Sequence, residues 1–219
     1  MLNFLRRSSF VRHLYRSLEC IFLRIFGNNR FRKIGINNHI RISRNVSFKD
    51  CRITIKGSNN AVIFEESCTL RGLNILIIGV GNVISFGKHT VVNASRVQPT
   101  VINCVGGGRI IIGQGSLFSN NIEIHNTDYH GIYNLNGERI NPEKDIIIGK
   151  SVWVGLGSKI LKGAHLSDYT IVGCGSLVSG YFSDKCVAIA GNPAKVIKSG
   201  VFWNHRRENT CPIPEELHR

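Results

Sequence analysis

A repeat of six residues constrains the fold of this chain more than any other feature. From Ile148 onward every sixth residue is aliphatic, and the residue two places before the next one is small or β-branched. This period differs from that of an amphipathic helix, about 3.6 residues, and from the alternation of a plain strand. It is typical of a solenoid whose coils have three faces of about six residues each. We therefore expect a parallel β-helix with these aliphatic side chains inside: Ile148, Val154, Ile160, Leu166, Val172 and Val178.

The upstream half carries a second, longer repeat. GINNHIRI begins at Gly35, GSNNAVIF at Gly57 and GVGNVISF at Gly79, so the copies are 22 residues apart and share Gly-x-x-Asn followed by apolar positions. Glycine at the start of each copy is expected where the chain turns tightly. We interpret each copy as one coil of about eighteen residues with a few more at a corner.

Composition and charge narrow the class of protein. The 219 residues include 23 Gly, 5 Pro and 42% hydrophobic residues, which predicts one compact domain with short appendages. Lys and Arg outnumber Asp and Glu by 28 to 14, and this favours polyanionic partners. No zinc-finger spacing or aromatic-basic signature is present, so we expect no nucleic-acid partner. The seven cysteines include no CxxC pair, which favours free thiols in a reducing cytoplasm.

The first thirty residues differ from the repeats. Residues 1–30 predict a basic amphipathic helix, with Phe4, Val11 and Leu14 on one side and Arg12 and Arg16 on another. The apolar run is too interrupted for a membrane span. Such a helix could lie on the inner face of an anionic cytoplasmic membrane, or it could cap the first coil, and the two roles are compatible. The remainder divides into a β-helix over residues 31–198 and a C-terminal tail over residues 199–219.

A polar loop interrupts the repeats at residues 126–145. It contains DYHGIY and GERINP and carries His130, while His125 directly precedes it. Solenoids tolerate insertions at corners because each coil contacts only its neighbours, and long insertions are usually functional. We therefore expect this loop to protrude from a corner and to contribute to function.

Four motifs resemble those of one family. They are DYHGIY, GERINPEKDIIIGKSVWVGLGSKILKGA, IVGCGSLVS and AGNPAKVIK. Together, over residues 109–198, they resemble the hexapeptide-repeat acyltransferases, in particular the O-acetyltransferases of bacterial capsule and O-antigen polysaccharides. The resemblance implies an all-β, left-handed β-helix that forms a homotrimer and binds acetyl-coenzyme A between subunits. It also implies a saccharide acceptor, namely a hydroxyl of a cell-surface polysaccharide or of its precursor.

That chemistry needs a base to take the proton of the attacking hydroxyl, and histidine is the usual choice because its pKa lies near neutral pH. In the family the base is a loop histidine upstream of the tryptophan of a VWIG-like motif, and His130 occupies that place here. Asp128 or Glu123 could orient the histidine ring and stabilise its protonated form. We favour Asp128.

His125 keeps a different function open. The spacing in HNTDYH is that of γ-class carbonic anhydrases, which are also trimeric left-handed β-helices, and His89 lies two ideal coils upstream. His89, His125 and His130 could then bind zinc across a subunit interface. The VWVG and GNPAKVIK motifs belong to the acyltransferase branch, so we expect no metal. A non-catalytic β-helix scaffold is a further alternative, and the intact His130 counts against it.

The resemblance also implies a donor site. The pantetheine arm of acetyl-coenzyme A should run along Gly155, Leu156, Cys174 and Ser179. Basic side chains of the GNPAKVIK motif should face the coenzyme A phosphates. An outward Trp153 side chain would line the groove near the thioester or the acceptor. The alternative is that it only packs at the corner. The residues expected to bind the donor are Trp153, Gly155, Leu156, Cys174, Ser179, Lys195 and Lys198.

Overall fold

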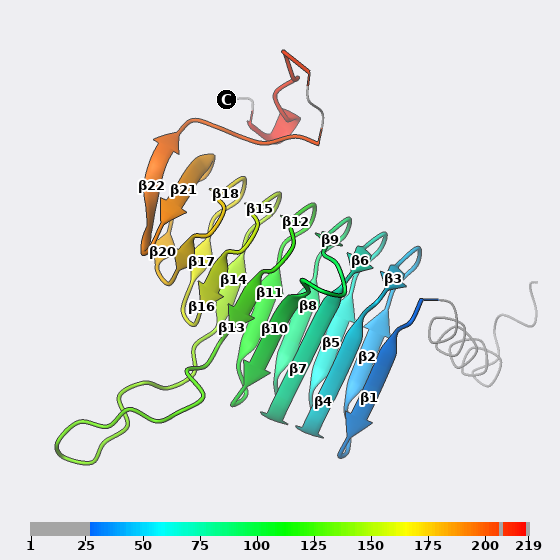
Figure 1. Cartoon of the computed structure of the whole chain (residues 1–219), viewed down its shortest axis with the longest axis vertical. Coiled ribbons are helices and arrows are strands. Elements are labelled where there is room, and N and C mark those ends of the chain that lie inside the picture. Colours follow the sequence, from blue (N-terminus) through cyan, green and yellow to red (C-terminus); the bar gives the residue numbers. More distant parts are fainter. Residues whose placement is uncertain (1–26, 206–207, 218–219) are drawn as a thin grey trace, which may run out of the picture.

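The computed structural model describes residues 27–205 and 208–217. In it the chain winds into a three-sided prism of parallel strands, with the first coils at one end and the last coils at the other (Figure 1). Successive strands join sheets A, B and C in turn, so every third strand returns to the same sheet. This arrangement confirms the parallel β-helix. The predicted N-terminal helix lies, as far as residue 26, outside the described residues.

Each coil contributes one strand to each sheet. Sheet A contains β1 (Arg30–Ile34), β4 (Arg52–Ser58), β7 (Leu73–Val80), β10 (Thr100–Val105), β13 (Glu123–His125), β16 (Lys159–Leu161) and β19 (Leu177–Val178). Sheet B contains β2 (His39–Ile42), β5 (Ala61–Phe64), β8 (Val83–Phe86), β11 (Arg109–Ile112), β14 (Ile146–Ile148), β17 (His165–Leu166) and β20 (Tyr181–Phe182). Sheet C contains β3 (Ser47–Lys49), β6 (Thr69–Arg71), β9 (Val91–Asn93), β12 (Leu117–Phe118), β15 (Trp153–Val154), β18 (Ile171–Val172), β21 (Val187–Gly191) and β22 (Ala194–Ser199). A short 3-10 helix follows at Glu215–Leu217.

The six-residue repeat builds the core of the C-terminal coils. Its six aliphatic side chains, from Ile148 to Val178, are each at most 1% exposed. Burying one such side chain stabilises the fold by about 1.5–3 kcal/mol. In the first coils larger side chains fill the interior, and the rings of Phe48, Phe64 and Phe86 pack in sequence with centroids 5.0 and 4.9 Å apart. The prediction of inward aliphatic positions is confirmed.

The 22-residue repeat forms two ladders at the corner between sheets A and B. Gly57 lies opposite Gly79, and a Cβ on Gly57 would lie 1.9 Å from the Gly79 carbonyl oxygen. Since its φ is +122°, only glycine fits there. Asn60 accepts hydrogen bonds from the Asn82 side chain and backbone at 2.9 Å, and it donates to Asn38 at 3.0 Å and to the Gly79 oxygen at 2.9 Å. The repeated asparagine therefore links successive coils through buried amides.

The end of the chain departs from the coil pattern. Strand β22 runs antiparallel to β21, whereas all other strand pairs within the three sheets are parallel. The tail then returns to the prism, where the Trp203 indole donates to the Ser151 carbonyl and the Tyr169 hydroxyl donates to Glu216. No helix in the described part of the chain is both long and apolar enough to cross a membrane.

Candidate active site

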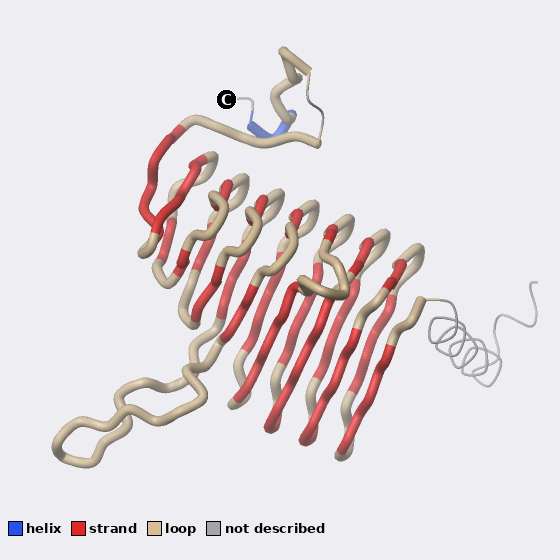
Figure 2. The backbone as a smooth tube through the Cα atoms, in the orientation of Figure 1, coloured by secondary structure: helices blue, strands red, loops and turns tan. Residues whose placement is uncertain are grey.

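The loop predicted at residues 126–145 lies between β13 and β14, at the corner where sheet A passes into sheet B. Figure 2 shows it leaving the prism as a long excursion and returning to the next strand. Asn126 is buried at its base and bonds to the Val105 backbone through both side-chain polar atoms, at 2.8 and 2.9 Å. The loop therefore starts from a backbone that the preceding coil holds in place.

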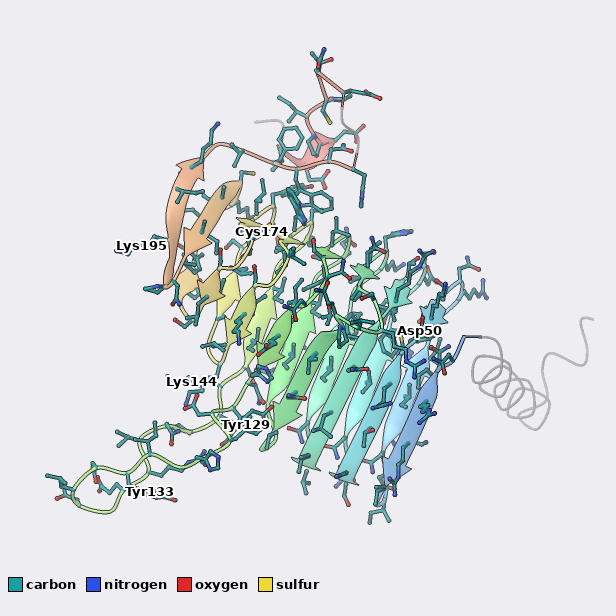
Figure 3. All side chains as sticks on the ribbon, in the orientation of Figure 1. Asp50, Tyr129, Tyr133, Lys144, Cys174 and Lys195 are labelled. Atoms are coloured by element: carbon teal, nitrogen blue, oxygen red, sulfur yellow. The ribbon has the colours of Figure 1, made fainter. Side chains whose placement is uncertain are left out.

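Tyr129 sets the direction of the backbone directly before His130. Its φ is 63°, a left-handed conformation that residues other than glycine seldom adopt. Its hydroxyl contacts the Asn103 amide and lies 3.0 Å from Nδ1 of His125. Figure 3 shows Tyr129 where the loop meets the prism and Tyr133 farther out. The tyrosine side chain thus ties the loop to sheet A one residue before His130.

Asn141 joins the two arms of the loop. Its side chain is buried, and Nδ2 donates both to the Asp128 carboxylate and to the His130 carbonyl oxygen at 2.8 Å. Its Oδ1 accepts from the Ile132 amide at 2.6 Å. These three bonds surround His130 and hold its main chain.

The His130 ring itself is exposed. Its amide donates to the Asp128 carbonyl oxygen at 2.8 Å, and its carbonyl accepts from Asn141. Within the part of the chain that the structure describes, the imidazole makes no hydrogen bond or ion pair. Because the main chain of His130 is held and its imidazole has no partner among the described residues, both ring nitrogens are available to a substrate.

The Asp128 carboxylate contacts groups other than the His130 ring. It pairs with Lys162 at 2.5 Å, and the hydrogen bond from Lys162, followed by that from Asn141, lowers the pKa of Asp128. Lys162 is only 17% exposed and also donates to the Asn141 carbonyl oxygen at 3.1 Å. Asp128 therefore anchors the loop to the next coil, and it reaches His130 through Asn141.

His125 differs from His130 because both of its ring nitrogens have partners. The His125 side chain is 16% exposed, with Nδ1 3.0 Å from the Asn103 amide and Nε2 3.3 Å from the Glu123 carboxylate. Glu123 also pairs with Lys159 at 3.2 Å. Partial burial would raise the pKa of Glu123, but the Lys159 and His125 contacts outweigh it and lower the pKa. Glu123 therefore holds His125 rather than His130.

The three histidines of the metal alternative do not meet within one chain. His89 lies at the turn between β8 and β9, on the corner between sheets B and C, whereas the loop carrying His130 leaves the corner between sheets A and B. No group of three or more His, Cys, Asp or Glu side chains among the described residues could hold a metal ion. The six described cysteines are free thiols. Burial raises the pKa of Cys51 and Cys68 to about 11 and that of Cys104 to about 12, so these thiols stay protonated.

Most of the residues predicted to bind the donor gather elsewhere, where sheet C passes into sheet A. Trp153 on β15 points outward and is 37% exposed, and Gly155 and Leu156 follow it at the corner. Cys174 lies on the same corner in the next coil. A Cβ on Gly155 would lie 2.8 Å from the Cys174 amide nitrogen, so the two backbones pack closely. The corner therefore presents the exposed Leu156 and Cys174 beside an outward indole, with Gly155 buried between the coils.

Three other predicted donor residues lie apart from this corner. Ser179 lies between β19 and β20, on the corner of sheets A and B. Lys195 and Lys198 are exposed on β22. Figure 3 shows Cys174 and Lys195 toward the C-terminal end of the prism. In one chain, therefore, Gly155, Leu156 and Cys174 lie together, while Ser179 lies on a different corner of the prism.

His130 and Trp153 face different directions in one chain. Trp153 stands on sheet C, which is the face opposite the corner from which the loop of His130 projects. In one chain the two residues therefore lie on different sides of the prism.

Three residues of this site have only weak signals in the sequence. Asn141 and Lys162 lie inside the GERINPEKDIIIGKSVWVGLGSKILKGA motif, where a polar residue beside proline and a lysine in a repeat look unremarkable. Asn103 gives no local signal at all, because its partner His125 lies one coil away. Their roles depend on coil stacking, which sequence spacing alone does not define.

Comparison with known proteins gives consistent relatives. The chain is 33% identical over 198 residues to a polysialic acid O-acetyltransferase of Neisseria meningitidis, covering 82% of this chain and 92% of that protein. It is 30% identical over 124 residues to a polysialic acid O-acetyltransferase of Escherichia coli, of which it spans 38%. No protein-family model matches the chain.

Two solved structures are similar over most of their length. The polysialic acid O-acetyltransferase OatWY has a TM-score of 0.65 and 30% identity and covers 83% of this chain and 94% of its own. The polysialic acid-specific acetyltransferase NeuO has a TM-score of 0.63 and 26% identity and covers 82% of this chain and 90% of its own.

Proposed function

The chain belongs to the family of the polysialic acid O-acetyltransferases, whose fold is the left-handed β-helix of the hexapeptide-repeat acyltransferases, and on that premise we propose that it acetylates a hydroxyl of an acidic capsule polysaccharide. Its acceptor is a polymer of sialic acid, and its donor is acetyl-coenzyme A. The observation that carries this proposal is the exposed ring of His130 on a main chain held by Asn141. A general base must be fixed in direction yet open to substrate, and His130 combines both properties.

The reaction is a direct transfer. Acetyl-coenzyme A supplies a thioester carbonyl. His130 accepts the proton of the sugar hydroxyl as its oxygen bonds to that carbonyl carbon, the carbon–sulfur bond breaks, and His130 returns the proton to the leaving sulfur. Asp128 acts as a positioning residue through Asn141. No covalent acetyl-enzyme forms, so mass spectrometry of protein incubated with donor alone should show no acetylated cysteine.

We propose that the donor binds at the corner of sheets C and A. Leu156 and Cys174 are exposed at this corner and would contact an extended pantetheine arm, while buried Gly155 lets the two coils pack closely beneath it. Trp153 would flank the thioester, and Lys195 and Lys198 would face the phosphates. Ser179 lies on a separate edge and would join only from another subunit.

We infer a homotrimer from the separation of His130 and Trp153. If three prisms pack around a common axis, the loop of one subunit can reach the corner of the next, which would complete a site at each of three interfaces.

Residues 1–26 would hold the enzyme at the inner face of the cytoplasmic membrane, where the growing polymer emerges. Their sequence pairs apolar residues with several arginines, each worth about 1 kcal/mol near an anionic surface. Deletion of these residues should abolish sedimentation with anionic vesicles and leave turnover on a short acceptor intact. If the segment caps the first coil instead, the deleted protein should melt earlier.

Acetyl transfer to a defined panel tests the function. Purified protein with labelled acetyl-coenzyme A should acetylate sialic acid oligomers, and nuclear magnetic resonance should locate the new ester on a hydroxyl. Neutral capsule oligosaccharides of equal length are the control. Label on neutral acceptors alone, or on an amine, would contradict the proposal.

A further inference from the structure

A basic hollow lies on the first coils, away from the loop of His130. It has a volume of about 140 Å³, and its lining includes three arginines together with two asparagines and an aspartate: Arg30, Arg52, Arg96, Asn28, Asn74 and Asp50. Arg96 comes from the connection between β9 and β10, while the other arginines begin β1 and β4. Figure 3 shows Asp50 on these first coils, with Tyr129 far along the prism from it.

No described residue pairs with the side chains of the three arginines. All three are exposed, and within the described residues none of their guanidinium groups forms a hydrogen bond or an ion pair. The one carboxylate in the lining, Asp50, accepts from the Asn28 amide at 2.9 Å instead. The hollow thus keeps three positive charges against one negative charge. A guanidinium group binds a carboxylate through two parallel hydrogen bonds, so this site suits that anion.

The hollow shares an outward row of sheet A with the candidate active site. Strand register places Arg30, Arg52 and Asn74 side by side, and the same row continues through Val101 to Glu123. The neighbouring row runs from Arg32 to His125 in the same way: Arg32, Thr54, Leu76, Asn103 and His125. One continuous face therefore leads from the hollow to the base of the loop.

We propose that this hollow is a remote acceptor subsite that binds a carboxylate of the polymer several sugar units away from the one that is acetylated. The inference rests on the proposed function for the identity of the acceptor. Strand β4, which carries Arg52, lies three strands from β13, so roughly 14 Å separates them at about 4.8 Å per strand. A monosaccharide cannot span that length, whereas an oligomer can. The subsite would favour long acidic chains over short ones.

Charge reversal at two of the arginines tests the subsite. Arg52→Glu with Arg96→Glu should weaken binding of a long sialic acid oligomer, measured without donor, by roughly tenfold or more, because charge-assisted hydrogen bonds are lost. The KM for the same oligomer should rise in parallel. The KM for acetyl-coenzyme A and the turnover on a short acceptor should stay unchanged, since neither involves the first coils.

A matched control separates binding at a specific subsite from general electrostatic attraction between the basic protein and the acidic oligomer. Arg41 and Arg44 are exposed on the first coil, outside the hollow, so Arg41→Glu with Arg44→Glu makes an equal change of charge. The control should retain nearly full affinity. Equal loss in both double variants, or no loss in the first, would overturn the subsite.

Two further readouts separate failure of the subsite from failure of the proposed function. Binding is measured without turnover, so oligomer binding that depends on Arg52 and Arg96 supports the subsite even if no acetyl transfer occurs. If wild type and the Arg52→Glu, Arg96→Glu variant both acetylate the oligomer with the same KM, the proposed function stands and the subsite is refuted. If the Arg52→Glu, Arg96→Glu variant no longer binds anionic vesicles but binds the oligomer as before, the hollow contacts a membrane surface. That result would also refute the subsite.

Discussion

The two histidines near the loop have opposite environments, and the difference bears on their roles. His125 is nearly buried with both ring nitrogens engaged, while the His130 ring is exposed with its main chain held. A histidine committed to Glu123 and Asn103 would have to break these contacts before it could take a proton from a substrate. The geometry thus favours His130 as the base and gives His125 a part in holding Tyr129.

Alanine at position 130 should lower kcat by roughly 10²–10⁴, the usual contribution of a positioned general base. The fold should be unaffected, because the His130 side chain is exposed and makes no hydrogen bond or ion pair with the described residues. Steady-state kinetics with His125→Ala alongside gives the comparison. A larger loss of kcat in His125→Ala than in His130→Ala would reverse the assignment.

Asn141→Ala should lower kcat by about tenfold to a hundredfold while the KM for acetyl-coenzyme A stays constant. The substitution removes three hydrogen bonds that surround His130, and small displacements of a catalytic group are costly. The exposed Asn136 in the same loop provides a control, since Asn136→Ala removes no side-chain bond of this cluster. Unchanged kcat in Asn141→Ala would mean that the base does not depend on this residue.

At the scale of elements, the asparagine ladder connects the first three coils. Asn60 is fully buried, and each of its polar atoms bonds to a neighbouring coil. Asn60→Ala would leave the Asn82 amide and the Gly79 carbonyl without these partners. It should lower the free energy of unfolding by about 2–3 kcal/mol, measured by urea denaturation. Asn93→Ala, at an exposed strand end, should change it little, and equal effects would contradict the ladder's role.

The sequence predicts the elements of this fold better than the contacts of its site. The inward aliphatic residues from Ile148 to Val178 follow from periodicity, because every coil repeats the same geometry. Asn60 shows the limit of this reasoning: the repeat Gly-x-x-Asn marks a turn, but its bonds run between coils. For Asn141 and Tyr129 no period exists, since a loop takes its conformation from contacts such as Asp128 with Lys162. Asp128 was expected at the His130 ring, and only three-dimensional placement reveals Lys162 as its partner.

At the scale of the whole molecule, the opposed directions of His130 and Trp153 predict that two inactive variants restore activity when they are combined. His130→Ala and Trp153→Ala should each be nearly inactive alone. Co-expressed, they should regain up to about a quarter of wild-type activity if the proposed trimer forms, because mixed trimers would contain an interface with both intact residues. Activity is measured on purified mixed oligomers. Activity no higher than the average of the two separate variants would show that each chain carries its own complete site.

The antiparallel strand β22 has a consequence for solubility. A stack of parallel coils ends in open backbone groups that another stack could extend, and unprotected edges of this kind promote fibrous aggregation. Here the last strands of sheets A and B, β19 and β20, are two residues long, and on sheet C the chain reverses so that β22 presents Lys195 and Lys198 at the edge. A second molecule would meet two short strands on sheets A and B. On sheet C it would meet a charged strand that runs opposite to the direction that a further parallel coil requires. The hairpin of β21 and β22 thus leaves sheet C without a parallel edge strand at this end for another stack of coils to extend.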